Sequence, residues 1–139
     1  MAVPLMMLLG FAAWTLLLLL FTVGVYRWAR ILTGRIPEGG FPADRVEGEE
    51  WYRRSMRAHA NCIENLPVYT AIVLAASAAH VDDALLDWLA VVLLVARVIQ
   101  SSIHVSFVQT NRAVSFRFSF FMVQFVCMTV MGIHVALAA

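Results

Sequence analysis

Long runs of apolar residues constrain this chain more than any other feature of its sequence. The first run has no charged residue from Met1 to Tyr26 and is followed by Arg27 and Arg30. A helix needs about 20 mostly apolar residues to cross the roughly 30 Å hydrocarbon core of a bilayer. Since 62% of the 139 residues are hydrophobic and 14% are charged, too little polar surface remains to cover a domain in water. We therefore expect an integral protein of a lipid bilayer, and we exclude a soluble enzyme and a disordered chain.

The apolar runs predict an all-α membrane protein, a bundle of four transmembrane helices that forms a single domain over residues 1–139. The expected spans are about 4–32, 55–79, 85–109 and 113–136, with a loop rich in Gly and Pro at about 33–54. The second span is the least apolar, because its uncharged part, Asn65 to Val81, is too short to cross comfortably. The polar residues before Asn65 must therefore lie inside the bilayer or at its edge.

The distribution of charge predicts how the bundle is oriented. The first loop and the turn after the third span carry arginine, whereas the turn after the second span carries acids only: Arg35, Arg45, Arg53, Arg54 and Arg112 against Asp82, Asp83 and Asp87. The positive-inside bias places the two arginine-bearing connections in the cytoplasm and both termini outside, in the inner or plasma membrane if the source is bacterial. A net charge of +1 gives no basic excess for a nucleic-acid partner.

Two stripes of polar residues cross the second and third spans. Helical spacing puts Arg57, Asn61, Glu64 and Asn65 on one face of the second span and leaves His59 on another, and it aligns Arg97, Gln100, Ser101 and His104 on the third. An ionisable side chain inside a membrane helix costs several kcal/mol unless it is paired, so it usually faces the bundle interior and marks function. These stripes are the candidate functional site.

Depth and charge predict an ion pair between Glu64 and Arg97. Both lie about 10–18 Å from the cytoplasmic edge at 1.5 Å of rise per residue. Each of these residues also has an alternative without a functional role. The Glu64–Arg97 pair could be purely structural, Arg57 could be an interfacial anchor, and His104 could be a hydrogen-bonded histidine inside the bundle. Gln124, alone in the fourth span, is able to bond a neighbouring helix.

The two cysteines and the other candidate ligands predict no metal site. Cys62 and Cys127 stand in apolar stretches without metal-ligand or disulfide spacing, so we expect packing thiols. The polar stripes line an apolar wall with guanidinium groups, an amide, a carboxylate and a histidine. Such a pocket suits a small soluble molecule with carboxylates and an ammonium group, next to lipid that holds a hydrophobic second substrate.

The stretch from Arg57 to Pro67, Arg-Ala-His-Ala-Asn-Cys-Ile-Glu-Asn-Leu-Pro, resembles the second-helix signature of the MAPEG family, the membrane-associated proteins in eicosanoid and glutathione metabolism. The length, the four spans, the polar first loop and Arg97 on the third span fit this resemblance over nearly the whole chain. The resemblance implies a homotrimer with glutathione bound between subunits near the cytoplasmic side. It also implies glutathione conjugation, peroxide reduction or isomerisation of lipid substrates.

The resemblance implies roles for individual residues. Asn61 and Glu64 correspond to residues that hold the glutathione backbone, and Arg112 to the arginine that stabilises its thiolate. Arg57 and His59 order the motif helix. The remaining candidate glutathione-binding residues are Arg97, His104 and Arg35, the last reaching a neighbouring subunit's ligand. From these roles we expect Asn61, Glu64, Arg97 and Arg112 to converge around one hydrophilic cavity.

The chain also departs from several eicosanoid-pathway members. It has Ala60 where they have Arg, Ala113 where prostaglandin E synthase has Ser, and His104 and Phe116 near positions where they have Tyr. These departures favour a general detoxifying glutathione transferase or peroxidase over eicosanoid synthesis. They also keep open a non-catalytic lipid-binding or scaffold protein. A transporter is the weaker alternative, because only Pro67 interrupts a span.

Overall fold

The computed structural model describes residues 1–35, 41 and 48–139, and over these residues the fold is helical without strands. The elements are α1 (Val3–Leu18), the π-helix η1 (Leu19–Gly24), α2 (Val25–Leu32), α3 (Glu50–Ala78), α4 (Ala84–Ser106) and α5 (Asn111–Ala138). The all-α prediction is therefore confirmed for the described residues. Arg45 and half of the predicted loop 33–54, residues 36–40 and 42–47, lie outside them.

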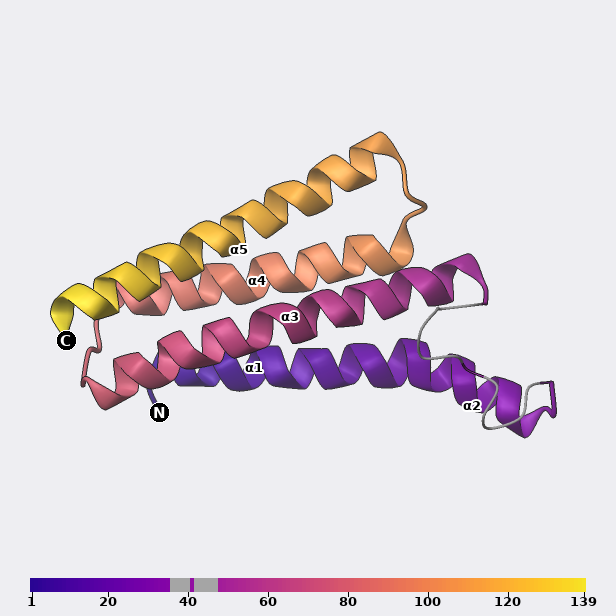
Figure 1. Cartoon of the computed structure of the whole chain (residues 1–139), viewed down its shortest axis with the longest axis horizontal. Coiled ribbons are helices and arrows are strands. Elements are labelled where there is room, and N and C mark those ends of the chain that lie inside the picture. Colours follow the sequence, from indigo (N-terminus) through magenta and orange to yellow (C-terminus); the bar gives the residue numbers. More distant parts are fainter. Residues whose placement is uncertain (36–40, 42–47) are drawn as a thin grey trace.

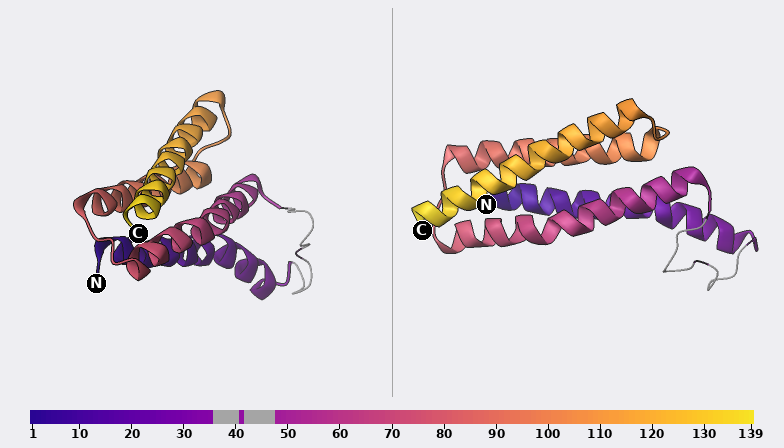
Figure 2. Two further views of the ribbon diagram at one scale, coloured as in Figure 1. Left: turned by 60° about the vertical axis from the view of Figure 1, so that its left-hand side comes forward. Right: turned by 45° about the horizontal axis from the view of Figure 1, so that its top comes forward.

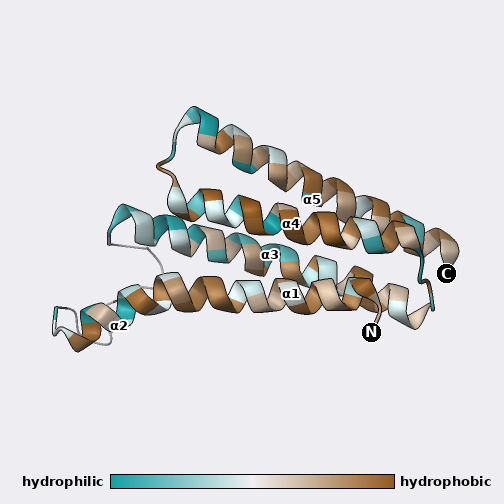
Figure 3. Ribbon diagram, turned by 180° about the vertical axis from the view of Figure 1, so that it is seen from behind, coloured by the Kyte–Doolittle hydropathy of each residue, from teal (hydrophilic) through white to brown (hydrophobic). Residues whose placement is uncertain are grey.

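Four helical rods lie side by side, the first of them made of α1, η1 and α2 in succession (Figure 1). The two termini lie at one end of the bundle, and the end of α2, the start of α3 and the turn between α4 and α5 lie at the other end. Among the described residues three segments are long and apolar enough to cross a membrane, Val3–Leu32, Ala84–Ser106 and Asn111–Ala138. The helix α3 lies alongside them although its first half is polar, as the hydropathy colours show (Figure 3).

Two helix boundaries differ from the predicted spans. The helix α3 begins at Glu50 rather than near residue 55, and it continues through Pro67. An acid such as Glu50 is favourable in the first turn of a helix, where the macrodipole is positive. The helix α4 ends at Ser106 rather than near residue 109, and the turn that follows leads to Thr110, whose hydroxyl caps α5 by accepting from the Ala113 amide.

The helix α4 is the centre of the bundle and packs against α1, α3 and α5. The apolar core draws residues from all four rods, among them Phe11, Tyr69, Leu93 and Met131. The buried residues of α5 all lie between Gln124 and Val135, in its C-terminal half. Its N-terminal half diverges from α4 (Figures 1 and 2). The bundle is therefore closed at the end of the termini and open at the other end.

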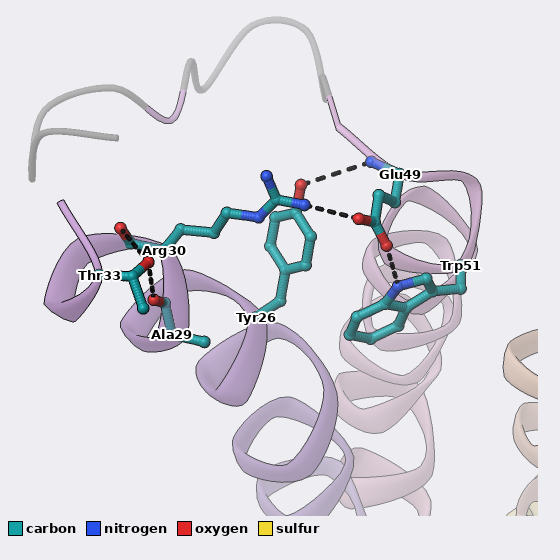
Figure 4. A network of polar contacts seen from close by, with 6 residues as sticks. All are labelled: Tyr26, Ala29, Arg30, Thr33, Glu49 and Trp51. Carbon is teal, nitrogen blue, oxygen red and sulfur yellow. Dashed lines mark hydrogen bonds and ion pairs between the residues drawn. The ribbon is translucent and has the colours of Figure 1, made fainter. Parts of the chain in front are cut away.

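A second, aromatic cluster joins α2 to the start of α3. Tyr26 stacks on Tyr52, with ring centroids 4.0 Å apart, and both rings are buried. Figure 4 shows the polar contacts around it: Arg30 pairs with Glu49 at 2.6 Å, and Trp51 donates its Nε1–H to the same carboxylate at 2.7 Å. Gly48 has a φ of 137°, and a Cβ there would lie 2.6 Å from the Tyr26 hydroxyl. A glycine is therefore needed where the chain meets this cluster.

Candidate functional site

The motif on α3 presents its polar residues on two sides of the helix. Ala58 and Cys62 are buried against the bundle, whereas Arg57 and Glu64 are exposed and Asn61 is half-buried. The Asn65 amide donates to the Asn61 carbonyl at 2.7 Å and so stays on the motif's own helix. His59 is half-buried and interacts with the backbone of Thr15 in α1. Arg57, Asn61 and Glu64 therefore form an outward-facing row, which we call the α3 polar face.

The α3 polar face reaches into the depth of the membrane. If the far edge of the hydrocarbon lies near Ala78, where α3 ends, about 20 residues of helix bring the near edge to the vicinity of Ala58. Glu64 then lies about 9 Å inside that edge at 1.5 Å per residue. No ion pair with Glu64 forms within the described residues. The carboxylate thus stands exposed on one chain at a depth where lipid is a poor environment for it.

The predicted Glu64–Arg97 ion pair is wrong for a single chain. Arg97 is 1% exposed and lies inside the bundle, with its guanidinium 5.4 Å from the centre of the Phe11 ring. The group of α3 that lies next to Arg97 is the thiol of Cys62, and the Cys62 sulfur is 3.7 Å from the Ser101 hydroxyl. The Arg97 Nε and Nη2 atoms have no hydrogen-bond partner among the described residues. The pair fails because Glu64 points away from the helix that carries Arg97.

Arg112 lies at the start of α5, exposed, and lines two hollows next to the connection between α4 and α5. One has a volume of about 480 Å³ and is lined also by Asn111, Ser115 and Ser119. The other, about 820 Å³, is mostly apolar and lies between the end of α4 and the start of α5. We call the second one the α4–α5 groove; its walls are Ile103, Ser106, Phe107, Val108, Thr110, Arg112, Ala113, Phe116 and Phe120.

A third hollow, of about 600 Å³, lies beside α3 and is lined by Glu50, Arg53, Arg54, Met56, Arg57, Ala60 and Gln109. It shares no lining residue with the two hollows of Arg112. The expected single cavity of Asn61, Glu64, Arg97 and Arg112 is therefore wrong within one chain. The physical reason is the divergence of α5, which carries Arg112 away from α3, together with the burial of Arg97.

The structure brings three guanidinium groups, those of Arg54, Arg57 and Arg117, close to His104 at this end of the bundle. His104 is 5% exposed, in the last turn of α4, and the charges of Arg54, Arg57 and Arg117 act on it. The Arg54 guanidinium also reaches the Val105 carbonyl at 3.4 Å. Arg35 lies apart from this group, exposed just beyond the end of α2.

Arg117 is the residue that the sequence analysis missed. It is half-buried on α5, seven residues before the buried Gln124, and therefore on the inward side of the helix. The signal was present, since Arg117 is the only charged residue between Ala113 and Ala139. An ionisable residue in such a run is a candidate by the same rule that singled out Glu64.

Two polar predictions are confirmed. The Gln124 side chain donates to the Gln100 Oε1 atom at 2.9 Å, so that it bonds a neighbouring helix. Cys62 and Cys127 are buried, as expected of thiols that pack against the core. No group of three or more His, Cys, Asp or Glu in the described part of the chain is arranged to hold a metal ion.

Comparison with known proteins bears on the family alone. Neither the curated proteins nor the solved structures contain a match to this chain. The model of the MAPEG family matches residues 5–137, which include the motif of α3 and all four rods apart from the first two residues of α1 and the last of α5. With nearly its whole length matched, the chain belongs to the MAPEG family.

Proposed function

We propose that the chain is an integral-membrane glutathione transferase or peroxidase, assembled as a homotrimer, that acts on hydrophobic electrophiles or lipid peroxides. Membership of the MAPEG family supports a membrane function of the glutathione-related kind in broad terms. The apolar helices support an integral membrane protein. The substrate, the thiol and the assembly are the parts that the proposal adds.

The observation that carries the proposal is the exposure of the α3 polar face. An ionised carboxylate against hydrocarbon costs several kcal/mol, so a stable protein covers Glu64 with protein or with a polar ligand. A neighbouring subunit supplies such a cover and encloses a hydrophilic space at this depth. Since the groups that one chain keeps apart are Arg112 and the α3 polar face, an interface between subunits is the place where they meet.

The available residues fit the chemistry of glutathione. Its ammonium group suits the Glu64 carboxylate, its amides suit Asn61, and its carboxylates suit guanidinium groups such as that of Arg57. Arg97 is too buried to touch a ligand on this face, so we assign it a supporting role behind the motif, next to Cys62. His59 holds α3 against α1 in the same indirect way, and Arg35 and His104 remain candidate contacts from the surroundings of the site.

Arg112 has the chemical role in this proposal. A guanidinium next to a thiol favours the thiolate, which is the nucleophilic form, and no general base is then needed. The sulfur forms a bond to the electrophilic carbon of the apolar substrate, and the leaving group departs with the electron pair. The exposed N-terminal half of α5, which carries Arg112, lies next to the lipid that delivers that substrate.

The test uses the purified intact protein with glutathione and a chlorinated nitroaromatic electrophile, while thiolate absorbance and product are followed. We expect a thiolate signal and turnover in the wild type. Arg112→Ala should lower kcat by roughly 100-fold, the usual cost of removing one stabilising donor. Arg30→Gln is the matched control, because Arg30 forms a surface pair with Glu49 and should leave both readouts unchanged. Equal behaviour of wild type and Arg112→Ala, without a thiolate signal, would refute the enzymatic proposal.

A second candidate is a lipid-binding protein of the same family without catalysis. The size and apolar lining of the α4–α5 groove favour it, as does the lack of a hydroxyl at Ala113 and Phe116 in its wall. This candidate predicts lipid binding without thiolate formation. The experiment above therefore separates the two functions.

A further inference from the structure

The charged side chain of Arg97 lies in the middle of the membrane-spanning bundle. Arg97 is about 20 Å from the start of α4 at Ala84 and about 14 Å from its end at Ser106, at 1.5 Å per residue. The residue is 1% exposed, so its guanidinium does not reach water or lipid headgroups at either end. A charge at this depth is stable only where an anion or a full set of hydrogen bonds replaces the lost water.

No carboxylate of the described residues pairs with Arg97. The ion pairs that these residues form are Arg30–Glu49, Arg54–Glu50 and His134–Asp83. Glu64 belongs to the exposed α3 polar face, and Asp87 precedes Arg97 by ten positions on α4, about 15 Å along the axis. The Phe11 ring, 5.4 Å from the guanidinium, attracts the cation but has no net charge. Since the Arg97 Nε and Nη2 atoms also lack hydrogen-bond partners in the described part of the chain, this charge is uncompensated as long as every neighbour is neutral.

The side chain next to Arg97 on the neighbouring helix is the thiol of Cys62. The helices α3 and α4 lie side by side, and Cys62 is fully buried in the bundle (Figure 1). Its sulfur is 3.7 Å from the hydroxyl of Ser101, which lies one helical turn after Arg97. The Arg97 charge and the Cys62 sulfur act on each other directly. A thiol beside a guanidinium ionises more readily than one in apolar surroundings, and of the neighbours Phe11, Ser101 and Cys62 only the last can become an anion.

Cys127 shows a packing thiol in the same bundle. It is 4% exposed and belongs to the apolar core cluster, together with Met128 and Met131. No charged side chain of the described residues acts on its sulfur. The two thiols are thus about equally buried and differ in whether a guanidinium lies next to them. Cys127 is therefore a matched control for Cys62.

The hydroxyl of Ser101 can serve either state of Cys62. It has one proton, which lies toward the Arg97 carbonyl at 2.7 Å. A neutral Cys62 would donate its own proton to the Ser101 oxygen, whereas an ionised Cys62 would accept the Ser101 proton. The Arg97 carbonyl loses little in the second case, because it also accepts the Ser101 amide proton within α4. The uncompensated charge of Arg97 favours the ionised state.

We propose that Cys62 is a thiolate and forms a buried ion pair with Arg97. The pair joins α3 to α4 at the level of the α3 polar face, since Cys62 directly follows Asn61 in the chain. Cys62 therefore serves as an acidic residue of the core, and the polar character of the motif extends to the inner side of α3. This inference does not depend on the proposed glutathione chemistry.

The direct test is infrared spectroscopy of the purified intact protein in detergent near neutral pH. An S–H bond absorbs in a region free of other protein bands, and a thiolate has no S–H bond. We expect the wild type to show the S–H absorption of one thiol, that of Cys127. Cys62→Ser should leave this band unchanged, and Cys127→Ser should remove it. Arg97→Met should add a second contribution to the band, since Cys62 takes up a proton once the guanidinium is gone. A wild-type band that weakens in Cys62→Ser, showing that both thiols are protonated, would overturn the proposal.

A second test replaces each thiol by a carboxylate. Cys62→Asp places a carboxylate beside Arg97, whereas Cys127→Asp, the matched control, places one in apolar surroundings. We expect the Tm of Cys62→Asp to stay within about 5 °C of the wild type and that of Cys127→Asp to fall by more than about 10 °C, since an unpaired buried carboxylate is costly. Combining Cys62→Asp with Arg97→Met should remove this tolerance. A variant that does not fold counts as destabilised beyond this range. Equal destabilisation by the two Asp substitutions would show that Arg97 does not hold an anion at Cys62, and it would overturn the ion pair.

Discussion

At the scale of single residues, the sequence predicts how deep a side chain lies in the membrane, but it predicts only in part the side of the helix on which that side chain lies. Glu64 and Arg97 have similar depths, which is why they were expected to pair. However, Cys62 is the α3 residue that faces Ser101 and Arg97, and Glu64 lies about 200° further round the helix, at 100° per residue. The Gln100–Gln124 bond could be predicted in kind because a buried amide in a membrane helix has few partners to choose from.

The direction of Glu64 leads to a prediction on stability. Arg97→Met and Glu64→Gln should have additive effects on the free energy of unfolding, to within about 0.5 kcal/mol, since the side chains do not touch. Arg97→Met alone should cost no more than about 1 kcal/mol, because it removes a buried charge whose Nε and Nη2 atoms lack partners. Denaturant unfolding in detergent of the wild type, both single variants and the double variant measures both quantities. A coupling energy of several kcal/mol between the two substitutions would contradict this prediction and show that Glu64 and Arg97 form an ion pair.

At the scale of helices, the number and approximate position of the rods could be predicted because apolar length decides them. The divergence of α5 could not, since α4 and α5 are both apolar and their sequences contain no signal for the angle between them. The ends of the helices were also harder to predict: α3 begins at Glu50, earlier than expected, and α4 ends at Ser106, also earlier than expected. The site was misjudged for the same reason, because Arg112 follows α5 outward while His104 stays inside.

The closed end of the bundle has a tie between α4 and α5 that the sequence did not reveal. Asp83 caps α4 by accepting from the Leu86 amide at 3.0 Å, and the same carboxylate contacts the Nε2 atom of His134 on α5 at 2.5 Å. The hydrogen bond from His134, followed by that from Leu86, lowers the pKa of Asp83 below its usual value. The tie therefore depends on the ionised carboxylate.

This tie predicts a pH dependence of stability. A carboxyl group whose pKa is lower in the folded state contributes stability above its unfolded pKa, and it loses that contribution as the pH falls through the folded pKa. Asp83→Asn keeps a capping oxygen but removes the charge, so it should unfold at a lower temperature than the wild type near neutral pH. The difference in Tm should shrink as the pH falls below about 4. Thermal unfolding of both proteins across this range checks the sign, and a constant difference would contradict it.

At the scale of the whole molecule, a single chain exposes two kinds of surface, an apolar one that suits lipid and a polar one that does not. Most of the exposed side chains on α1, α4 and α5 are apolar, among them Leu16, Val95 and Phe125. The α3 polar face is the exception, with exposed Arg57 and Glu64 in the same bundle. A single chain is therefore poorly matched to a bilayer on one side only, and an assembly that buries this side removes the mismatch.

The mismatch leads to a prediction on assembly. The protein should travel as three chains in native mass spectrometry from a mild detergent, and the intersubunit contact should include α3. Ala60→Cys places a thiol on this exposed stretch of α3, next to Arg57 and Asn61, while both native thiols are buried. Glutathione should slow maleimide labelling of that thiol, whereas Ala136→Cys, exposed at the far end of α5, should react at the same rate with or without it. A monomer at every detergent concentration would contradict the trimer.

The π-helical segment η1 also bears on how the first rod accommodates change. Its buried residues before and within η1, Leu18 and Val23, are five positions apart, one more than an α-helix allows on a single face. The first rod is therefore held at two places. Its first part, α1, packs into the bundle core, and its last part, α2, packs against α3 through Tyr26 and the aromatic cluster. The wide turn of η1 lets Leu18 and Val23 both face inward. Removing one residue between Leu19 and Gly24 would turn α2 by about 100° relative to α1 and move Tyr26 out of its stack with Tyr52.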